Sequence, residues 1–461
     1  MNLKIIILFL FICDTSSQEY DDKNMLNKLI AEKKSFHLTK KKSKVNFNNF
    51  AFKQLFTLND GIPNLENRNG IYAPKGNLVS TSLLFGFKSK YLSFSAEPTI
   101  IKFDNYESEN VYDNSVFKYS NSTYSSLNEV MLKNSKIHLL YKEIIVGYEN
   151  VPQWWGPGIH NSLMLTNNAN GLPNYFIKMN DKESFFNGIS YEIKLFSTKS
   201  IKNEFGNDYY ISALQTIFIY KNLELGIARL SFSGGYDNII WNIQKALLPL
   251  ISNKNLRNSD IIDDYYISYS FPQSKTKLFA EFGLLNNKNS KNIYRNNTLA
   301  SNIGMRKYGV LGKESFSFGI EYTRLVQSSF YDRIPTPNWY DNPVYDYSSF
   351  NNRIIGAHSG IDSDDLLLYF GLIEDNKSII IAFNYERHGV TYRFPPEVKL
   401  EQKIIANYLF SNLSLQIEYE SEHFRHYGFV DSNQNIWNEE FEIGSVINSK
   451  TLLFSLKLNL F

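Results

Sequence analysis

An alternation of apolar and polar residues with a period of two runs from about residue 76 to the end of this chain. Within each segment, one set of alternate positions is apolar: Phe316, Phe318, Ile320 and Tyr322; Ile379, Ile381, Phe383 and Tyr385; Leu413, Leu415, Ile417 and Tyr419. Many of the positions between them carry polar or charged side chains. Because successive side chains of a strand point to opposite faces, each segment predicts a β-strand with one apolar and one polar face.

A soluble antiparallel sandwich and a transmembrane barrel both produce this alternation. Three observations favour the barrel. The segments continue over residues 76–461 without a domain break, and Tyr and Phe, which make up most of the 15% aromatic share, cluster at segment ends. The chain also ends inside a strand whose Leu452, Phe454, Leu456, Leu458 and Leu460 share a face. Closing the sheet removes both edges, which hydrocarbon would not tolerate unpaired.

The predicted fold class is therefore all-β: a transmembrane antiparallel β-barrel of about 16–18 strands, with a short N-terminal helical segment. The terminal Phe461 resembles the signal that barrel-insertion machinery reads, although it is out of phase with the apolar face before it. Polar inserts at residues 105–128, 236–264, 286–297 and 328–352 are predicted to be extracellular loops or lumen fillers, and residues 239–250 to hold a short helix broken at Pro249.

The N-terminal region predicts export. Residues 1–17 have the basic, apolar and small-residue parts of a signal peptide. Cys13 raises the alternative of a lipoprotein, but it follows Ile12, where a small residue is expected. Residues 18–58 are predicted to be a periplasmic helix and linker, because Met25, Leu26, Leu29 and Ile30 share a helical face. A frayed terminus is the alternative for this region. Residues 59–461 are then the barrel.

The most unusual local sequence is a pair of tryptophans before a sharp Gly-Pro-Gly turn, Trp154-Trp155-Gly156-Pro157-Gly158. A short apolar strand is predicted after the turn, and Asn170-Gly171 forms a second turn. The tryptophans have two interpretations. They are either residues of an interfacial aromatic girdle or a platform on which a sugar ring stacks.

This segment resembles the capsule-assembly (Wzi-type) outer-membrane family, which carries Trp-Gly-Pro-Gly and then Ser-Leu-x-Leu-Ser-Asn-Asn-Ala-x-Gly-x-Pro. Thr166 stands here where Ser is usual, and Asn170 where Pro is common. Further similar segments are 222–229, with its Leu-Glu-Leu-Gly and Arg229; 279–283, aromatic-Ala-Glu-aromatic-Gly; and 353–364, with Arg353, Gly356 and Asp362. The resemblance extends over residues 60–461.

The resemblance implies a barrel of the bacterial outer membrane, about 18 strands in size, that binds capsular or exopolysaccharide and assists its assembly or attachment at the cell surface. The candidate glycan-binding residues are Trp154, Trp155, His160, Asn167, Asn168, Arg229, Arg353, His358 and Asp362. Trp241 and Trp339 are further candidates for ring stacking. The expected partners are the polysaccharide, outer-membrane lipids, lipopolysaccharide and the barrel-insertion machinery. We expect a monomer.

No cofactor, metal site or enzymatic activity is predicted. The sequence lacks Gly-x-Ser-x-Gly, His-Glu-x-x-His and the glycine-rich nucleotide motifs. His423 and His426 would point to opposite faces of a strand, and the acidic residues at 362, 364 and 365 favour a solvated turn over a calcium loop. A net charge of +2 favours no nucleic-acid partner. The alternative functions are an outer-membrane porin or substrate-selective channel and a scaffold for a secretion complex.

Overall fold

The computed structural model describes residues 25–36, 47–64, 66–71, 73–103, 128–186, 188–236, 243–250, 259–286, 297–325, 339–340, 342–391, 393–437 and 442–460. Most of these residues belong to one large antiparallel sheet. Its strands are β1 (Phe47–Asn59), β2 (Gly76–Lys88), β3 (Leu92–Phe103), β4 (Asn128–Tyr141), β5 (Ile144–Glu149), β6 (Asn174–Phe186), β7 (Ile189–Thr198), β8 (Ile201–Lys202), β9 (Asp208–Tyr220), β10 (Leu223–Gly234), β11 (Ser259–Phe271), β12 (Thr276–Asn286), β13 (Asn297–Tyr308), β14 (Phe316–Arg324), β17 (Ser363–Ile373), β18 (Lys377–His388), β19 (Glu397–Phe410), β20 (Leu413–Arg425) and β23 (Ile447–Asn459).

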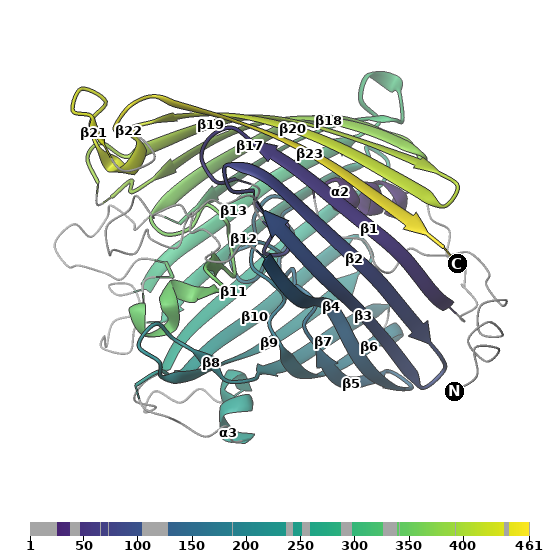
Figure 1. The fold of residues 1–461 in the computed structure, drawn as a ribbon. Helices are drawn as coiled ribbons and strands as arrows, with labels where there is room; N and C mark the ends of the chain where they lie inside the picture. The colour runs from purple at the N-terminus through teal and green to yellow at the C-terminus, as the bar shows by residue number, and fades with distance from the viewer. Residues whose placement is uncertain are drawn as a thin grey trace, which may run out of the picture.

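The sheet closes on itself. Apart from β8, which pairs only with the start of β9, each strand pairs antiparallel with the next, from β1 to β23. β23 then pairs with β1, from Ala51↔Asn459 to Asn59↔Thr451. Figure 1 shows the resulting barrel, in which the yellow last strand lies beside the purple first strand. The predicted fold class is confirmed as a closed antiparallel barrel of 18 strands.

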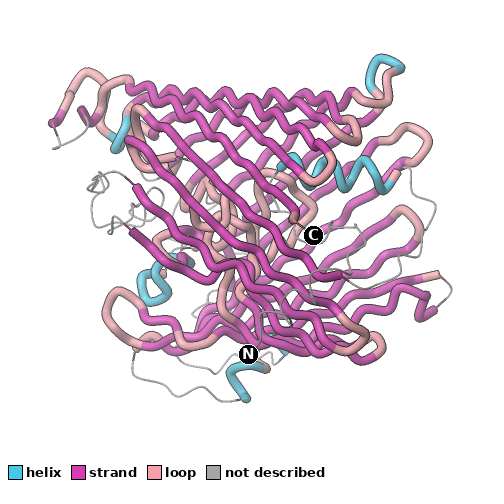
Figure 2. Tube along the Cα trace, turned by 45° about the vertical axis from the view of Figure 1, so that its right-hand side comes forward, coloured by secondary structure: helices cyan, strands magenta, loops and turns pink. Residues whose placement is uncertain are grey.

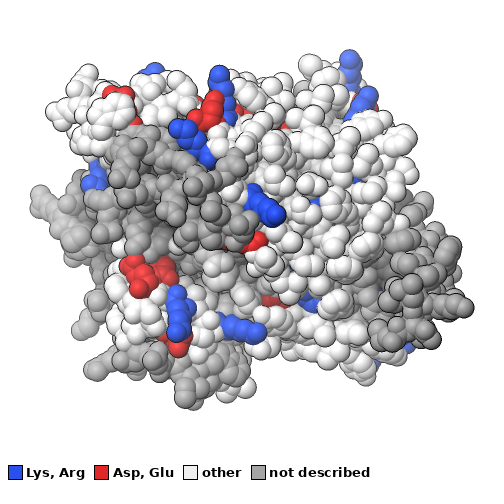
Figure 3. All heavy atoms as spheres, viewed as in Figure 1, with Lys and Arg blue, Asp and Glu red and all other residues white. Residues whose placement is uncertain are grey.

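The predicted alternation corresponds to the two sides of the wall. On β18, the outward residues Ile379 and Ile381 are 46% and 42% exposed, whereas the inward residues Asn384 and Glu386 are 4% and 2% exposed. The same pattern runs along β14. Figure 3 shows a broad area of the outer wall with few charged side chains. An apolar outer wall of this extent suits contact with hydrocarbon. Closure of the sheet also leaves no strand edge with unpaired backbone groups.

The two ends of the barrel differ in their connections. At one end, which we call the turn end, successive strands are joined by short turns such as residues 221–222 and 411–412, and β23 ends there. Exposed aromatic side chains gather near this end: Tyr91, Tyr141, Tyr220, Phe271 and Phe410. The opposite end, which we call the loop end, carries the long connections. Short turns on the inner side and long loops outside are typical of outer-membrane barrels.

The barrel begins earlier than the sequence analysis placed it. Residues 47–58, assigned there to a linker, belong to β1; they pair with β2 along their whole length and, from Ala51 onward, also with β23. The predicted helix is α2 (Met25–Ser35), and it lies inside the barrel rather than beyond it. Its buried Leu26 and Leu29 pack against residues of the inner wall, including Tyr308 and Ile380. Figure 2 shows this helix behind the front strands.

The remaining elements are short. They are α3 (Ile243–Ala246), η2 (Leu248–Leu250), η3 (Val310–Gly312), η5 (Pro343–Ser348), η6 (Tyr427–Phe429) and the pairs β15 (Ser349–Phe350) with β16 (Arg353–Ile354) and β21 (Ile436–Trp437) with β22 (Glu442–Ile443). The helix predicted near Pro249 corresponds to α3 and η2. Among the described residues, no helix has the length and apolar character needed to cross a membrane. Residues 1–17, Trp241 and Phe461 lie outside the described residues.

Candidate functional site

Three connections of the loop end fold back into the lumen and fill it. They are residues 60–75, 150–173 and the described part of the β14–β17 connection, 339–362, and we call them the plug loops. Figures 1 and 2 show these segments inside the ring of strands. Their apolar side chains, among them Leu163, Met164, Trp339 and Ala357, pack with residues of the inner wall in the largest buried apolar cluster of the described residues.

The second plug loop contains the unusual Trp-Trp-Gly-Pro-Gly sequence. The short apolar strand predicted after the turn is wrong: residues 150–173 contain a single bridge, between Trp155 and Leu165, and no strand. Gly158 is required here by close approach, because a Cβ atom on it would lie 2.6 Å from the amide nitrogen of Asn302 and 2.7 Å from Oε1 of Glu321. The turn therefore brings backbone against the inner wall.

Two wall carboxylates hold this loop in place. Glu321 of β14 accepts hydrogen bonds from the backbone N–H groups of Ile159, His160 and Asn161, at 2.9, 3.2 and 2.7 Å. Glu281 of β12 accepts one from the N–H of Leu163 at 2.8 Å and another from the Ser162 hydroxyl at 3.1 Å. Hydrogen bonds to a buried carboxylate are among the stronger ones in proteins, so the loop is fixed to the wall.

The plug loops also bind each other. Asn69 and Gly70 of the first loop donate their N–H groups to the carbonyls of Asn167 and Asn168 in the second, at 2.6 and 3.1 Å. In the third loop, the carbonyl of Ile354 accepts a hydrogen bond from the amide of Asn168 at 3.1 Å. The three loops therefore form one hydrogen-bonded body in the lumen.

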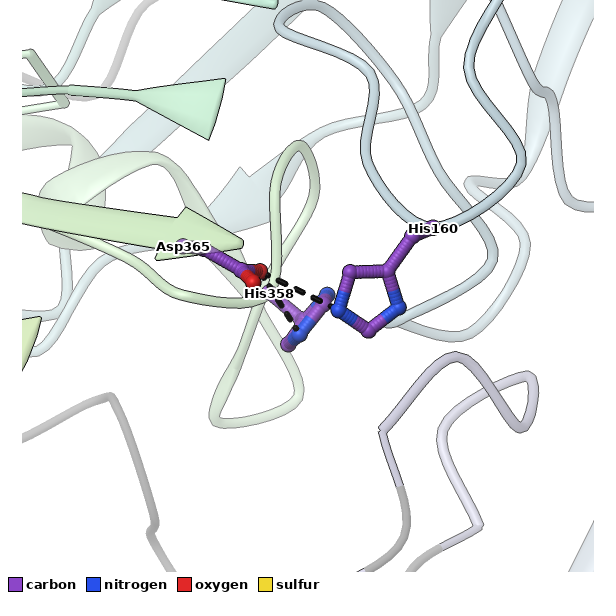
Figure 4. Close-up of side chains that lie close together, drawn as sticks. All are labelled: His160, His358 and Asp365. Carbon is purple, nitrogen blue, oxygen red and sulfur yellow. Dashed lines mark ion pairs between the residues drawn. The ribbon is translucent and has the colours of Figure 1, made fainter. Parts of the chain in front are cut away.

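A pair of histidines marks the junction of plug and wall (Figure 4). The ring of His160, from the second loop, meets that of His358, from the third, edge to face at 4.4 Å between centroids. Their Nε2 atoms lie 3.2 and 3.4 Å from Oδ2 of Asp365, at the start of β17. Burial would lower the pKa of His160, but the Asp365 carboxylate outweighs it and the pKa is raised. Burial and the neighbouring His160 lower the pKa of His358.

Most of the predicted glycan-binding residues lie in this buried body. Seven are at most 8% exposed: Trp155, His160, Asn167, Asn168, Arg353, His358 and Asp362. Trp339 is fully buried, and Trp155 packs edge to face on Phe196 at 5.3 Å. Trp154 is half-buried beneath the ammonium group of Lys28 in α2. These side chains therefore contact protein in this structure, and the tryptophan pair belongs to the plug rather than to an outer girdle.

Arg229 lies apart from the other predicted residues. It shares the outward face of β10 with Leu225 and Ile227 and forms an ion pair with Asp263 of β11. The structure also corrects the acidic turn at residues 362–365, which is not solvated. Asp362 accepts hydrogen bonds from the N–H of Thr391 at 2.9 and 3.1 Å, while Asp364 pairs with Arg387 on the outer wall.

Several residues that organise the lumen were missed from the sequence. Glu281 and Glu321 hold the second plug loop, and Tyr340 donates its hydroxyl to the carbonyl of Leu163 at 2.7 Å. The sequence did contain one signal for the two glutamates. Each is an acidic residue on the polar face of a strand whose other residues are mostly apolar or small, and a single buried carboxylate of this kind needs a hydrogen-bonding partner. Nothing in the sequence indicates which loop supplies that partner.

An open pocket of about 660 Å³ lies at the loop end, above the plug. Its lining combines aromatic rings with amide, basic and acidic side chains: Tyr148, Lys199, Lys202, Asn203, Glu204, Asp346, Phe350, Asn351 and Asn352. Lys199 places its ammonium group 4.6 Å from the centre of the Tyr148 ring. A second cavity, of about 160 Å³, lies between the plug and the inner wall of β1–β4 and is lined by Lys53, Arg68, Asn69, Glu97, Lys133 and Asn134. The first cavity has the size of a small-molecule site.

Two side-chain groups have metal-binding chemistry. The first is the histidine pair with Asp365, and the second is Glu66, Glu401 and Glu420. In the first group, Nδ1 of His358 lies 3.2 Å from the amide nitrogen of Asn67, which also donates to the carbonyl of His160. That arrangement favours an unprotonated Nδ1, and hence a proton on Nε2 of a neutral His358, where a metal ion would need a lone pair. The first group is therefore poorly arranged for a metal.

Comparisons with known proteins give a consistent family. The family model described as capsule assembly protein Wzi matches residues 60–390. A search of the curated proteins finds no match. Among solved structures, the fold is similar to Wzi of Escherichia coli, described as an outer membrane protein involved in group 1 capsule assembly and as a carbohydrate-binding β-barrel. The TM-score is 0.61 at 11% identity, covering 88% of this chain and 83% of that chain.

Two further solved structures match with lower TM-scores. OccK7 (OpdD) of Pseudomonas aeruginosa has a TM-score of 0.49 at 11% identity and covers 91% of this chain and 100% of that chain. OccAB4 of Acinetobacter baumannii has a TM-score of 0.47 at 11% identity and covers 90% of this chain and 98% of that chain. The family assignment depends on the sequence model, which matches residues 60–390, well over half of the chain. This chain belongs to the Wzi family of capsule assembly proteins.

Proposed function

We propose that this protein is a barrel of the bacterial outer membrane that binds capsular or exopolysaccharide and assists its assembly or attachment at the cell surface. The observation that carries the proposal is the open pocket of about 660 Å³ at the loop end of a barrel of this family, above a filled lumen. A concave pocket lined by the β7–β9 connection and the third plug loop suits a ligand that approaches from the loop end. The similar fold of Escherichia coli Wzi, described as carbohydrate-binding, supports the proposal.

The chemistry of the pocket suits a sugar. Tyr148 and Phe350 offer ring faces on which the C–H side of a pyranose stacks, and the amides of Asn351 and Asn352 suit hydroxyl groups. Lys199 and Lys202 can donate hydrogen bonds to a sugar, and Glu204 and Asp346 can accept them from its hydroxyl groups, so the lining offers both kinds of charged partner without an excess of positive charge. Each contact is weak in water. A repeating polymer engages many barrels at once, so avidity rather than the affinity of one pocket holds the polysaccharide.

The predicted site residues in the plug then act indirectly. The amide of Asn168 donates a hydrogen bond to the carbonyl of Ile354. Arg353 of β16 is the pairing partner of Phe350 in β15. We propose that these buried residues position the pocket floor instead of contacting the glycan. Arg229, on the outer wall, faces lipid or lipopolysaccharide. We propose a monomer surrounded by lipid, inserted by the barrel-insertion machinery, with no enzymatic step.

A gene deletion and a pocket variant test the proposal together. Deletion is expected to release polysaccharide into the medium, and the wild-type gene to restore attachment. The variant Lys199→Ala/Lys202→Ala/Asn351→Ala is expected to bind the purified polysaccharide at least tenfold more weakly. The matched control is Lys221→Ala/Lys377→Ala, which removes two exposed lysines near the turn end. Polysaccharide that stays fully cell-attached after deletion would rule the proposal out.

The alternative, a porin or substrate-selective channel, has one observation in its favour. The cavity of about 160 Å³ between the plug and β1–β4 is polar and basic, as part of a narrow path for anions would be. Planar-bilayer recordings separate the two functions. Steady conductance of the wild-type barrel, saturable by one class of solute, would favour the channel, whereas a closed barrel that retains polysaccharide favours binding.

A further inference from the structure

The inner wall of β19 and β20 and the first plug loop place an unbalanced group of charges in the lumen. Four carboxylates lie together there: Glu66 of the loop, Glu401 of β19, and Glu420 and Glu422 of β20. Two ammonium groups lie among them, Lys399 and Lys403 of β19. The five wall side chains are at most 12% exposed, and that of Glu66 is 13% exposed. With all six ionised, the sum of −4 and +2 leaves a charge of −2.

The lysines are already shared between several acids. Nζ of Lys399 lies 2.6 Å from Glu66 and 3.2 Å from both Glu401 and Glu422, and it also lies 3.2 Å from Glu386 of β18, outside this group. Nζ of Lys403 lies 2.8 Å from Glu401 and 3.2 Å from Glu420. Burying charge without neutralising it is costly. Other ionised groups nearby do not supply the missing positive charge, because Arg68 pairs with Glu418 and His388 lies between Glu386 and Glu397.

Some carboxylate oxygens in this group have no partner. Oε2 of Glu66 and Oε2 of Glu420 are buried, and neither has a hydrogen-bond donor or an ammonium group within reach among the described residues. Oε2 of Glu422 is likewise buried and has no hydrogen-bond donor among the described residues. The side chain of Glu420 is fully buried. Buried oxygens of this kind are rare in native proteins, where ordered water, a proton or an ion satisfies them.

The geometry of the acids suits one ion. Glu66, Glu401 and Glu420 each offer an oxygen such that all three lie within 4.8 Å of one another. Calcium binds oxygens at about 2.4 Å, so two ligands on opposite sides of one ion are separated by about 4.8 Å. Three carboxylates, able to bind through one or both oxygens, supply the hard, anionic ligands that calcium prefers. We propose that Glu66, Glu401 and Glu420 bind one Ca²⁺ ion inside the barrel, whose charge offsets the excess of −2.

The position of the site gives it a structural role. Glu66 belongs to a plug loop, whereas Glu401 and Glu420 are diagonal neighbours on adjacent strands of the wall, two residues out of register. One ion would therefore join the first plug loop to the wall, on the side of the lumen away from Glu281 on β12. Neutralisation by two protons is the competing explanation for the same charge excess, and the experiment separates them.

The test uses the full chain, purified in detergent, depleted with a chelator and dialysed. Metal analysis after reloading with Ca²⁺ is expected to give one ion per chain, and calorimetric titration a saturable site. Glu420→Gln and Glu401→Gln are expected to weaken the Ca²⁺ affinity at least tenfold. Lys403→Gln removes a competing cation and is expected to strengthen it at least tenfold. Mg²⁺ is expected to bind more weakly, because it tolerates irregular carboxylate geometry poorly.

Glu418→Gln is the matched control. It makes the same change two residues away on the inward face of β20, at a carboxylate paired with Arg68, and it is expected to leave the Ca²⁺ affinity within about threefold of wild type. Co-purified lipopolysaccharide also binds Ca²⁺, so the differences between variants decide. Absence of stoichiometric Ca²⁺ in the wild type overturns the proposal in favour of protons. Equal Ca²⁺ binding by all variants overturns it in favour of a site elsewhere. If Glu420→Gln fails to fold, the Ca²⁺ affinity of Lys403→Gln is compared with that of the wild type, and an affinity that does not increase overturns the proposal.

Discussion

His160 and His358 lie edge to face in the lumen, yet their surroundings favour opposite protonation states. The Asp365 carboxylate raises the pKa of His160 against the effect of burial, so its imidazolium form is favoured. Burial and the positive charge of His160 lower the pKa of His358, so its neutral form is favoured. One charged ring beside one neutral ring satisfies a single aspartate without placing two buried charges in contact.

This pair predicts two limbs in the pH dependence of stability. The contribution of His160 is fully present below its unfolded pKa of about 6.5 and is lost as the pH rises through its raised folded pKa. The contribution of His358 has the opposite sign: it is present above about 6.5 and is lost as the pH falls. Thermal unfolding of His160→Asn is therefore expected to differ from wild type mainly by a missing alkaline limb, and that of His358→Asn by a missing acidic limb.

The measurement is the melting temperature in detergent between about pH 4 and about pH 9, roughly one pH unit on each side of the range in which histidine side chains titrate. His423→Asn is the control, because His423 lies on β20 and hydrogen-bonds Asn448, away from the plug. The same pH profile in wild type and both lumen variants would show that the pair does not divide its charge as described.

At the scale of the element, α2 shows how a short helix depends on its surroundings. Eleven residues are too few for a stable helix in water. Leu26 and Leu29 are buried against the wall, and Arg306 binds Glu32 through Nε and Nη2, both at 2.8 Å. Burial would raise the pKa of Glu32, but Arg306 and Lys277 lower it to about 2. The helix is therefore held by one apolar face and one buried ion pair.

We predict that Leu29→Asp releases α2 from the lumen without opening the barrel wall. The substitution removes a buried leucine side chain and places an unpaired charge in an apolar contact. Together these changes weaken the docking of α2 by several kcal/mol. Released helix is expected to be cut by trypsin after Lys33 or Lys34, at a rate at least tenfold above wild type. Ala31→Asp, at an exposed position of the same helix, is expected to retain the wild-type rate. Equal cleavage of both variants would contradict the described packing.

The helix also shows where sequence reasoning ends. The spacing of Leu26 and Leu29 was enough to predict a helix, because amphipathic periodicity is local information. Its place inside the barrel depends on Arg306, which stands 274 residues from Glu32. In the same way, the alternation along β14 predicted that the side chain of Glu321 lies on the polar face of the strand. It did not predict that three N–H groups of a distant turn would donate to its carboxylate. Contacts between a loop and a remote strand leave no periodic trace in either segment.

For the whole molecule, a filled lumen predicts a barrel that conducts little. The plug rests on Glu281 and Glu321, which accept five hydrogen bonds from residues 159–163. The variant Glu281→Gln/Glu321→Gln removes carboxylate acceptors and adds amide donors opposite donors. Each poorly satisfied group costs about 1–3 kcal/mol. We expect the variant to loosen the plug and to raise single-channel conductance in planar bilayers several-fold over wild type.

Glu192→Gln is the control for this prediction, because its carboxylate pairs with Lys178 of the neighbouring strand and not with the plug loops. It is expected to conduct as little as the wild type. Wild-type conductance equal to that of the double variant would show that the plug does not close the lumen, and would favour a channel function.

The closure of β1 on β23 has a consequence for the order of events during biogenesis. The plug loops are bonded to strands on different sides of the lumen, including β12, β14 and β20, and the hydrogen-bonded seam between β1 and β23 leaves no lateral entrance once it has formed. Bulky side chains such as Trp155 and Trp339 therefore have to be in position while the sheet is still an open, curved ribbon. We therefore expect the strands to wrap around loops that are already folded, with the pairing of β1 and β23 as the last step of assembly.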